Sequence, residues 1–247
     1  MRGSAEEIAQ IRRQPVSFGA QKMPISFLKH AEDLTVLALA TVLRAVEQED
    51  WQGQRFADWG VVAAPNLFGR VSIAQSIQRY QQEGAWGVSP HLIPHQSLHA
   101  MSGTISQALK INGPNFGIGG SSNSGPDALL IAGAMMMDGL LPGLWVVLAG
   151  HETEWIPAAD GSPVPAPMCQ AIALALTPGK MDGTGIHLSL GQVATAEGID
   201  QAVPEVHLGL LAEEWLHQGT TPQGRWRLSS THWVEIESNV GDGEIRP

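Results

Sequence analysis

The stretch of residues 113–152 constrains the fold more than any other part of this sequence, because it contains a helix with almost no polar surface. Between Asp127 and Asp138 there is no charged residue, and the run ends in three consecutive methionines. A helix that is apolar on all sides belongs in an interior. Leaving one face in water would cost about 25 cal/mol per Å² of apolar surface. Either residues 177–247 fold back over this helix, or a second chain covers it.

A tight turn precedes the apolar helix. We expect a short strand at residues 118–120, a turn at 121–125 and a helix at 126–137. Pro126 would open the helix, where a missing amide proton is harmless. Ser122 then lies where strand meets helix. Such an elbow can present a nucleophile to the N-terminus of a helix.

This segment resembles the nucleophile region of the β-ketoacyl synthases, which belong to the thiolase superfamily. Gly113-Pro114 falls on the family's Gly-Pro pair, and Ser124-Gly125 falls on its Ser-Gly pair. In the same register, Ser122 takes the position of the catalytic cysteine.

Two further blocks extend the resemblance. Residues 89–94, Ser-Pro-His-Leu-Ile-Pro, resemble the family's Ser-Pro-x-x-x-Pro stretch at the matching distance upstream. Ala149-Gly150 with Glu152 resembles the Ala-Gly-Gly-x-Glu end of the following strand. The likeness covers roughly residues 26–176.

The resemblance implies an α/β, thiolase-like fold: a single βαβαβ half with a mixed, mainly parallel sheet and a buried central helix. A full ketosynthase has two such halves, and 247 residues are only a little over half of one. No segment after Leu176 resembles the motifs of the two active-site histidines that the family carries in its second half. We expect a loose N-terminal arm at residues 1–24 and a ketosynthase-like domain at 25–247.

Hydrophobic periodicity and turn residues place the remaining elements. Helices are expected at residues 26–48, 71–82, 97–109 and 205–217. Strands are expected at 59–64, 144–148, 170–176 and 186–190, with an edge strand at 232–238. This order predicts a largely parallel sheet.

The composition limits the classes of molecule that this protein can bind. The net charge of −10 argues against nucleic acid and anionic membranes and is compatible with a basic partner surface. No apolar run approaches the ~20 residues that span a bilayer, and the N-terminus lacks a signal-peptide pattern, so we expect a cytoplasmic protein. The single cysteine, Cys169, excludes an intrachain disulfide and a cysteine-rich metal site. We expect no cofactor.

Ser122 allows three interpretations. A serine hydroxyl is too weak an acid to ionise as a catalytic cysteine does, so it needs a general base within hydrogen-bond reach. Ser122 is one of three things: a small residue that preserves a turn in a noncatalytic relative, a nucleophile served by a local histidine, or part of a noncatalytic ligand pocket. Candidate bases precede the elbow or follow its next strand: His91, His95, His99 and His151.

The histidines and Cys169 are less informative about function. His95 and His99 have the spacing of one helical turn, but no carboxylate supports them as metal ligands, so we expect no metal. His151 takes the place of a family glycine and would crowd a turn. Cys169, at the start of an apolar strand, is expected to be a small buried hydrophobe.

Together these features predict a noncatalytic, chain-length-factor-type subunit. It would pair with a full-length ketosynthase or with itself and would meet acyl carrier protein only indirectly. The resemblance implies that Leu92, Ile93, Phe116 and Ser122 border the interface or the acyl pocket. The alternatives are an acyltransferase or hydrolase that uses Ser122, and a structural homodimer with a lipid-sized pocket.

Overall fold

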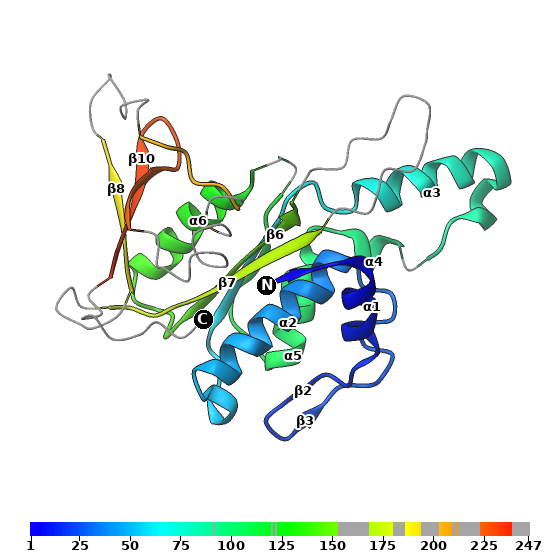
Figure 1. Cartoon of the computed structure of the whole chain (residues 1–247), viewed down its shortest axis with the longest axis horizontal. Coiled ribbons are helices and arrows are strands. Elements are labelled where there is room, and N and C mark those ends of the chain that lie inside the picture. Colours follow the sequence, from blue (N-terminus) through cyan, green and yellow to red (C-terminus); the bar gives the residue numbers. More distant parts are fainter. Residues whose placement is uncertain are drawn as a thin grey trace.

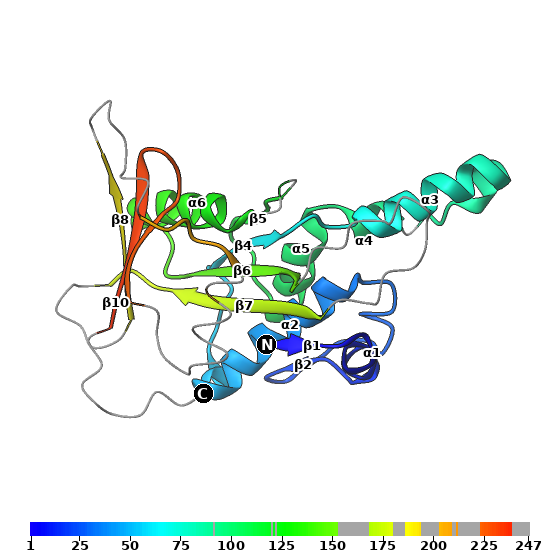
Figure 2. The same cartoon turned by 45° about the horizontal axis from the view of Figure 1, so that its top comes forward.

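The computed structural model describes residues 1–90, 92–119, 121, 123–152, 168–179, 186–193, 203–208, 211 and 223–238. Its main element is a five-stranded sheet in the order β1-β7-β6-β4-β5. These strands are β1 (Arg2–Gly3), β4 (Gly60–Pro65), β5 (Asn115–Gly117), β6 (Leu144–His151) and β7 (Cys169–Leu176). Helices lie on both faces of the sheet (Figures 1 and 2).

The sheet is mixed, as expected, but it is not mainly parallel. β4 pairs in parallel with β5 and with β6, whereas β7 runs antiparallel to both β6 and β1. The reversal at β7 was not visible in its composition, because a strand buried on both faces is a continuous apolar run in either direction.

One face of the sheet is covered by α2 (Asp33–Gln48) and α5 (His99–Leu109), with α1 (Ala5–Arg13) beside them. Nine of the sixteen residues of α2 are buried, which matches its expected amphipathic pattern. The helix begins seven residues later than predicted. Residues 24–31 form a run of tight turns instead, closed by bonds such as Phe27 N to Pro24 O (2.9 Å) and Lys29 N to Ser26 O (3.0 Å).

The opposite face carries α6 (Gly125–Met137), which corresponds to the predicted apolar helix. A second sheet of β8 (Ile186–Gln192), β9 (Gly224–Arg227) and β10 (His232–Ser238) lies beyond it. One apolar cluster joins both sheets to α6 and includes Ala128, Leu148, Trp226 and Ile236. The C-terminal residues therefore fold back over α6, and the chain is more than a single βαβαβ half.

The cover over α6 is incomplete. Ala128 and Ala132 are fully buried, but 37% of Ile131 and 85% of Met137 remain exposed. We expected a helix that is buried on all sides. The structure buries the faces of α6 toward the two sheets and leaves the remaining face exposed.

Two other predictions are corrected. Residues 232–238 form the central strand of the second sheet, not an edge strand, because β8 and β9 flank β10. The N-terminal arm is not loose. A capping box between Ser4 and Glu7 starts α1, Ile8 is completely buried, and β1 pairs with β7.

Most of the expected helix at 205–217 lies outside the described residues. Within it, Leu208 and Leu211 are buried against the α6 cluster. The remaining helices are α3 (Arg70–Glu83) and α4 (Leu92–Gln96), with short 3-10 turns η1 (Trp51–Gly53) and η2 (Gly84–Gly87) and a small hairpin of β2 (Ser17–Phe18) and β3 (Gln21–Lys22).

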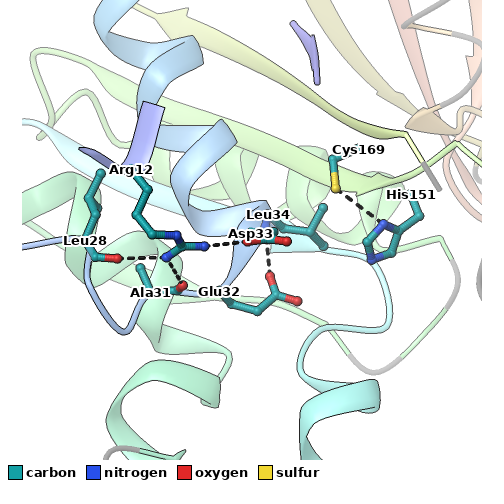
Figure 3. A network of polar contacts seen from close by, with 8 residues as sticks. All are labelled: Arg12, Leu28, Ala31, Glu32, Asp33, Leu34, His151 and Cys169. Atoms are coloured by element: carbon teal, nitrogen blue, oxygen red, sulfur yellow. Dashed lines mark hydrogen bonds and ion pairs between the residues drawn. The ribbon is translucent and has the colours of Figure 1, made fainter. Parts of the chain in front are cut away.

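An acidic residue caps α2. The Glu32 carboxylate accepts a hydrogen bond from the Leu34 amide at 2.9 Å, beside the Arg12–Asp33 ion pair (Figure 3). Desolvation raises the pKa of Glu32 to about 7, with a smaller contribution from Asp33, against the lowering effects of the Leu34 amide and Arg12. The folded state therefore favours the protonated acid.

We predict that Glu32→Gln stabilises the protein above pH 7. Because the folded pKa lies above the unfolded value of 4.5, the wild-type free energy of unfolding falls as pH rises from about 4.5 to 7. A neutral amide keeps an oxygen for the Leu34 amide and avoids the buried charge. Urea denaturation at pH 5 and pH 8 should show a gain of about 2 kcal/mol for the variant at pH 8 and little at pH 5. An equal change in the free energy of unfolding at both pH values would contradict the raised pKa of Glu32.

Candidate functional site

The turn before α6 is the candidate site, and neighbouring parts of the chain hold it firmly. Ser122 itself lies outside the described residues, but Ser121, Asn123 and Ser124 are described. The Ser121 carbonyl accepts a bond from the Leu67 amide (3.2 Å), and the Ser121 and Ser124 hydroxyl oxygens lie 3.3 Å apart. The turn therefore sits at the carboxyl ends of β4 and β6.

Asn66 is the residue that fixes the start of α6. It follows β4 directly, and its amide bonds to Ala149 O at the end of β6 (2.8 Å). Its side-chain oxygen accepts the Ser124 amide at 3.1 Å in a buried position. Ser124 has no capping bond from its own side chain, so Asn66 supplies the acceptor from another element.

The other side of the turn is bonded to the C-terminal part of the chain. The Asn123 side-chain amide donates to Glu205 Oε1 and to Val206 O, both at 3.0 Å. Glu205 also lies 3.5 Å from Arg227 of β9. The segment around residue 205 thus lies directly against the turn.

Gly150 shows why a glycine is needed beside this turn. A Cβ atom at this position would lie 3.1 Å from Leu208 and 3.2 Å from the Asn66 amide nitrogen. A side chain would push away the C-terminal segment, Asn66, or both. Packing therefore favours a glycine at position 150, whatever its role in chemistry.

Three of the four candidate bases have contacts away from this turn. The His151 Nδ1 atom lies 3.5 Å from Cys169 Sγ, across the β6–β7 pair (Figure 3). The His99 ring lies 3.4 Å from the Ser102 hydroxyl of its own helix, and the His95 ring is 5.8 Å from the His30 ring. His91 lies outside the described residues. His151 ends a strand and does not crowd a turn.

The Cys169–His151 contact does not form a reactive ion pair. Burial is the largest of the effects that raise the pKa of the Cys169 thiol to about 12, and burial also lowers the pKa of His151. Both shifts favour the neutral groups, so the thiol stays protonated at neutral pH. Cys169 is 4% exposed, as expected for a small buried hydrophobe.

The remaining predicted site residues lie on neighbouring elements. Phe116 is in the middle of the edge strand β5 and is 48% exposed. Leu92 and Ile93 open α4, and the placement of their side chains lies outside the described part of the chain. No three His, Cys, Asp or Glu side chains among the described residues are grouped to hold a metal ion. Across the same ranges, no helix has the length and apolar character to span a membrane.

The sequence pattern did not predict the hydrogen bonds that Asn66 and Asn123 make at this turn. An asparagine directly after a buried strand was a usable signal for Asn66, because the carboxyl ends of parallel strands lie at one edge of a sheet. No local signal connects Asn123 with residues more than eighty positions away.

Comparison with solved structures identifies the fold. No protein-family model and no curated protein matches the sequence. The chain is similar to a chain in the structure of a ketosynthase (ApeO) in complex with its chain length factor (ApeC) from Xenorhabdus doucetiae. The TM-score is 0.54 at 14% identity, over 94% of this chain and 92% of that one.

The fold is ketosynthase-like. A second solved structure, the ishigamide ketosynthase/chain length factor, aligns with a TM-score of 0.47 and 20% identity over 66% of this chain and 50% of that chain. The ketosynthase-like α/β fold agrees with the fold that the resemblance of residues 113–152 implies.

Proposed function

We propose that this chain is a noncatalytic, chain-length-factor-type subunit that pairs with an active β-ketoacyl synthase in fatty acid, polyene or polyketide biosynthesis. The ketosynthase would supply the Cys/His/His machinery and the direct contact with acyl carrier protein. This chain would supply the interface and part of the wall of the acyl tunnel. The observation that carries the proposal is the turn around Ser122, which is bonded to the chain's own C-terminal segment through Asn123.

We infer that a serine at this position is not activated. A serine nucleophile needs a base that is itself oriented by a third group. His99 contacts Ser102 of its own helix, His151 contacts Cys169 of β7, and the amide of Ser124 is already bonded to Asn66. A turn of this kind is suited to structural support and not to acyl transfer.

The strand before the turn offers a surface for the partner. β5 is the last strand of the described sheet and is bonded to β4 on one side. Open strand edges recruit other strands, and natural proteins protect them. Phe116 lies on this edge, and Leu98 beside it is 37% exposed. A Cβ atom on Gly117 would lie 2.0 Å from Leu98 O, so the edge and the start of α5 form one continuous surface.

A second apolar surface lies on α3, which extends away from the body of the protein (Figures 1 and 2). Ile73, Ile77 and Tyr80 are on one face of the helix and are 39%, 54% and 57% exposed. Trp86 in the following turn is 99% exposed. Isolated helices of this length are marginal in water, so contact with a partner would stabilise α3.

We predict no condensation or decarboxylation by this chain alone. The purified protein should not release CO₂ from malonyl-carrier protein, and Ser122→Cys should not create activity, because a thiolate without the histidine pair lacks its catalyst. The assay is CO₂ release, with an active ketosynthase as the positive control. Turnover that disappears in Ser122→Ala would overturn the proposal and favour a serine-dependent acyltransferase or hydrolase.

We also predict that the chain is not a stable monomer and that Phe116→Lys dissociates the assembly. A charge in the middle of β5 would have to be buried when a partner strand pairs with it. Light scattering at micromolar concentration should show the loss of the larger species, and the separated chain should unfold at a lower temperature than the assembly. Asp127→Lys, an exposed position on α6, is the control for an added lysine. A wild-type monomer of ordinary stability, alone and with the ketosynthase, would contradict this prediction.

The last prediction for this function concerns the tunnel. We propose that Leu92 and Ile93, at the start of α4, reach across the interface and line the far end of the partner's acyl pocket. Leu92→Ala should then allow one or two more acyl carbons, and Leu92→Trp should shorten the product. Product lengths from the reconstituted complex with its ketosynthase test this. Unchanged lengths in both variants, with the complex intact, would place the wall elsewhere.

A further inference from the structure

A basic hollow lies away from the turn, between the last turn of α1 and the tight turns that precede α2. Its lining consists of Arg12, Arg13, Ile25, Ser26 and Lys29, and its volume is about 580 Å³. The chain has a net charge of −10 and only 14 Lys and Arg residues. Three of these residues around one hollow make it a local exception to the acidic character of the protein.

Both walls of the hollow are held rigidly. The Arg12 guanidinium donates to Leu28 O at 2.8 Å and to Ala31 O, and it pairs with Asp33 (Figure 3). Leu28 and Ala31 are 3% and 7% exposed, so these turns are anchored in the core. Arg12 thus fixes α1 to the loop before α2 and joins the two backbone walls of the hollow.

The charges on the rim are not neutralised. Arg12 is paired with Asp33, but Arg13 and Lys29 are exposed and form no ion pair within the described part of the chain. Glu6 and Glu7 are on α1 but in its first turn, about 9–10 Å along the helix axis from Arg13. The rim therefore keeps two unpaired positive charges.

Apolar surface accompanies these charges. Ile25 is 84% exposed on the wall of the hollow, and the alkyl parts of the basic side chains add to it. A ligand that fits such a surface combines carboxylates with at least one apolar side chain. Guanidinium groups bind carboxylates in a bidentate manner, whereas the lysine ammonium acts as a point charge.

We propose that this hollow binds a short acidic segment of another protein, with glutamate or aspartate carboxylates on Arg13 and Lys29 and a neighbouring apolar side chain against Ile25. Two unpaired cations match a pair of carboxylates. They do not offset the repulsion between a chain of net charge −10 and a long polyanion such as nucleic acid or an anionic membrane. The site is independent of the proposed ketosynthase partnership, and either can fail without the other.

Fluorescence anisotropy with the full chain tests this proposal. The probe is a labelled ten-residue peptide that alternates glutamate and leucine, and the comparison is the same peptide with glutamine in place of glutamate. We expect the glutamate peptide to bind more tightly, and its affinity to fall as salt rises. Arg13→Glu and Lys29→Glu should each weaken binding about tenfold, which corresponds to about 1.4 kcal/mol.

Arg79→Glu is the matched control, because it reverses a charge on the exposed helix α3 and gives the same net charge as the two test variants. It should change the affinity less than twofold. Ile25→Asp should weaken binding without altering the fold, as judged by circular dichroism.

Three results would overturn the proposal. The first is no binding of the glutamate peptide at millimolar concentration. The second is an equal loss for Arg79→Glu and Lys29→Glu, which would indicate only a general charge effect. The third is binding to phosphatidylglycerol vesicles without binding to the peptide, which would make the hollow a lipid-headgroup site.

Discussion

The burial of α6 is the constraint on which the rest of this structure depends. Its sequence has no charged side chain between Asp127 and Asp138, so any exposed face costs free energy in proportion to its area. The five-stranded sheet covers one face, and the sheet of β8, β9 and β10 covers another. The position of the C-terminal residues follows from this requirement, because they supply Trp226, Val234 and Ile236 to the same apolar cluster.

The C-terminal segment that helps to cover α6 also contacts the turn before this helix. The segment that leads to β9 passes beside the turn, and Asn123 bonds to Glu205 and Val206 there. Leu208 packs against Gly150 from the same segment. A part of the chain that is needed to bury α6 is therefore bonded directly to the turn that precedes this helix.

Among the described residues, the exposed apolar side chains include those on the edge strand β5 with Phe116, on one face of α3, and at the end of α6 at Met137. On α3 the exposed apolar side chains share one helix face, and a contiguous apolar surface is typical of an interaction site. The basic hollow between α1 and the turns before α2 differs from these apolar surfaces, because its positive charge and not its apolar area distinguishes it.

The apolar helix and most strands were predictable from the sequence, because turn residues and unbroken apolar runs are local signals. The helix after the turn and the burial of Cys169 rest on such signals, whereas the strand before the turn lies at Asn115–Gly117 and not at residues 118–120 as expected. Sequence alone did not determine the antiparallel direction of β7, the central place of β10 or the integration of residues 1–24. Each depends on pairing between residues far apart, such as Arg2 with Gln170. At the candidate site, Ser122 is a prediction from its sequence neighbours. Asn66 and Glu205 were placed beside that turn only by tertiary packing, since a hydrogen bond between distant residues leaves no periodic trace in the sequence.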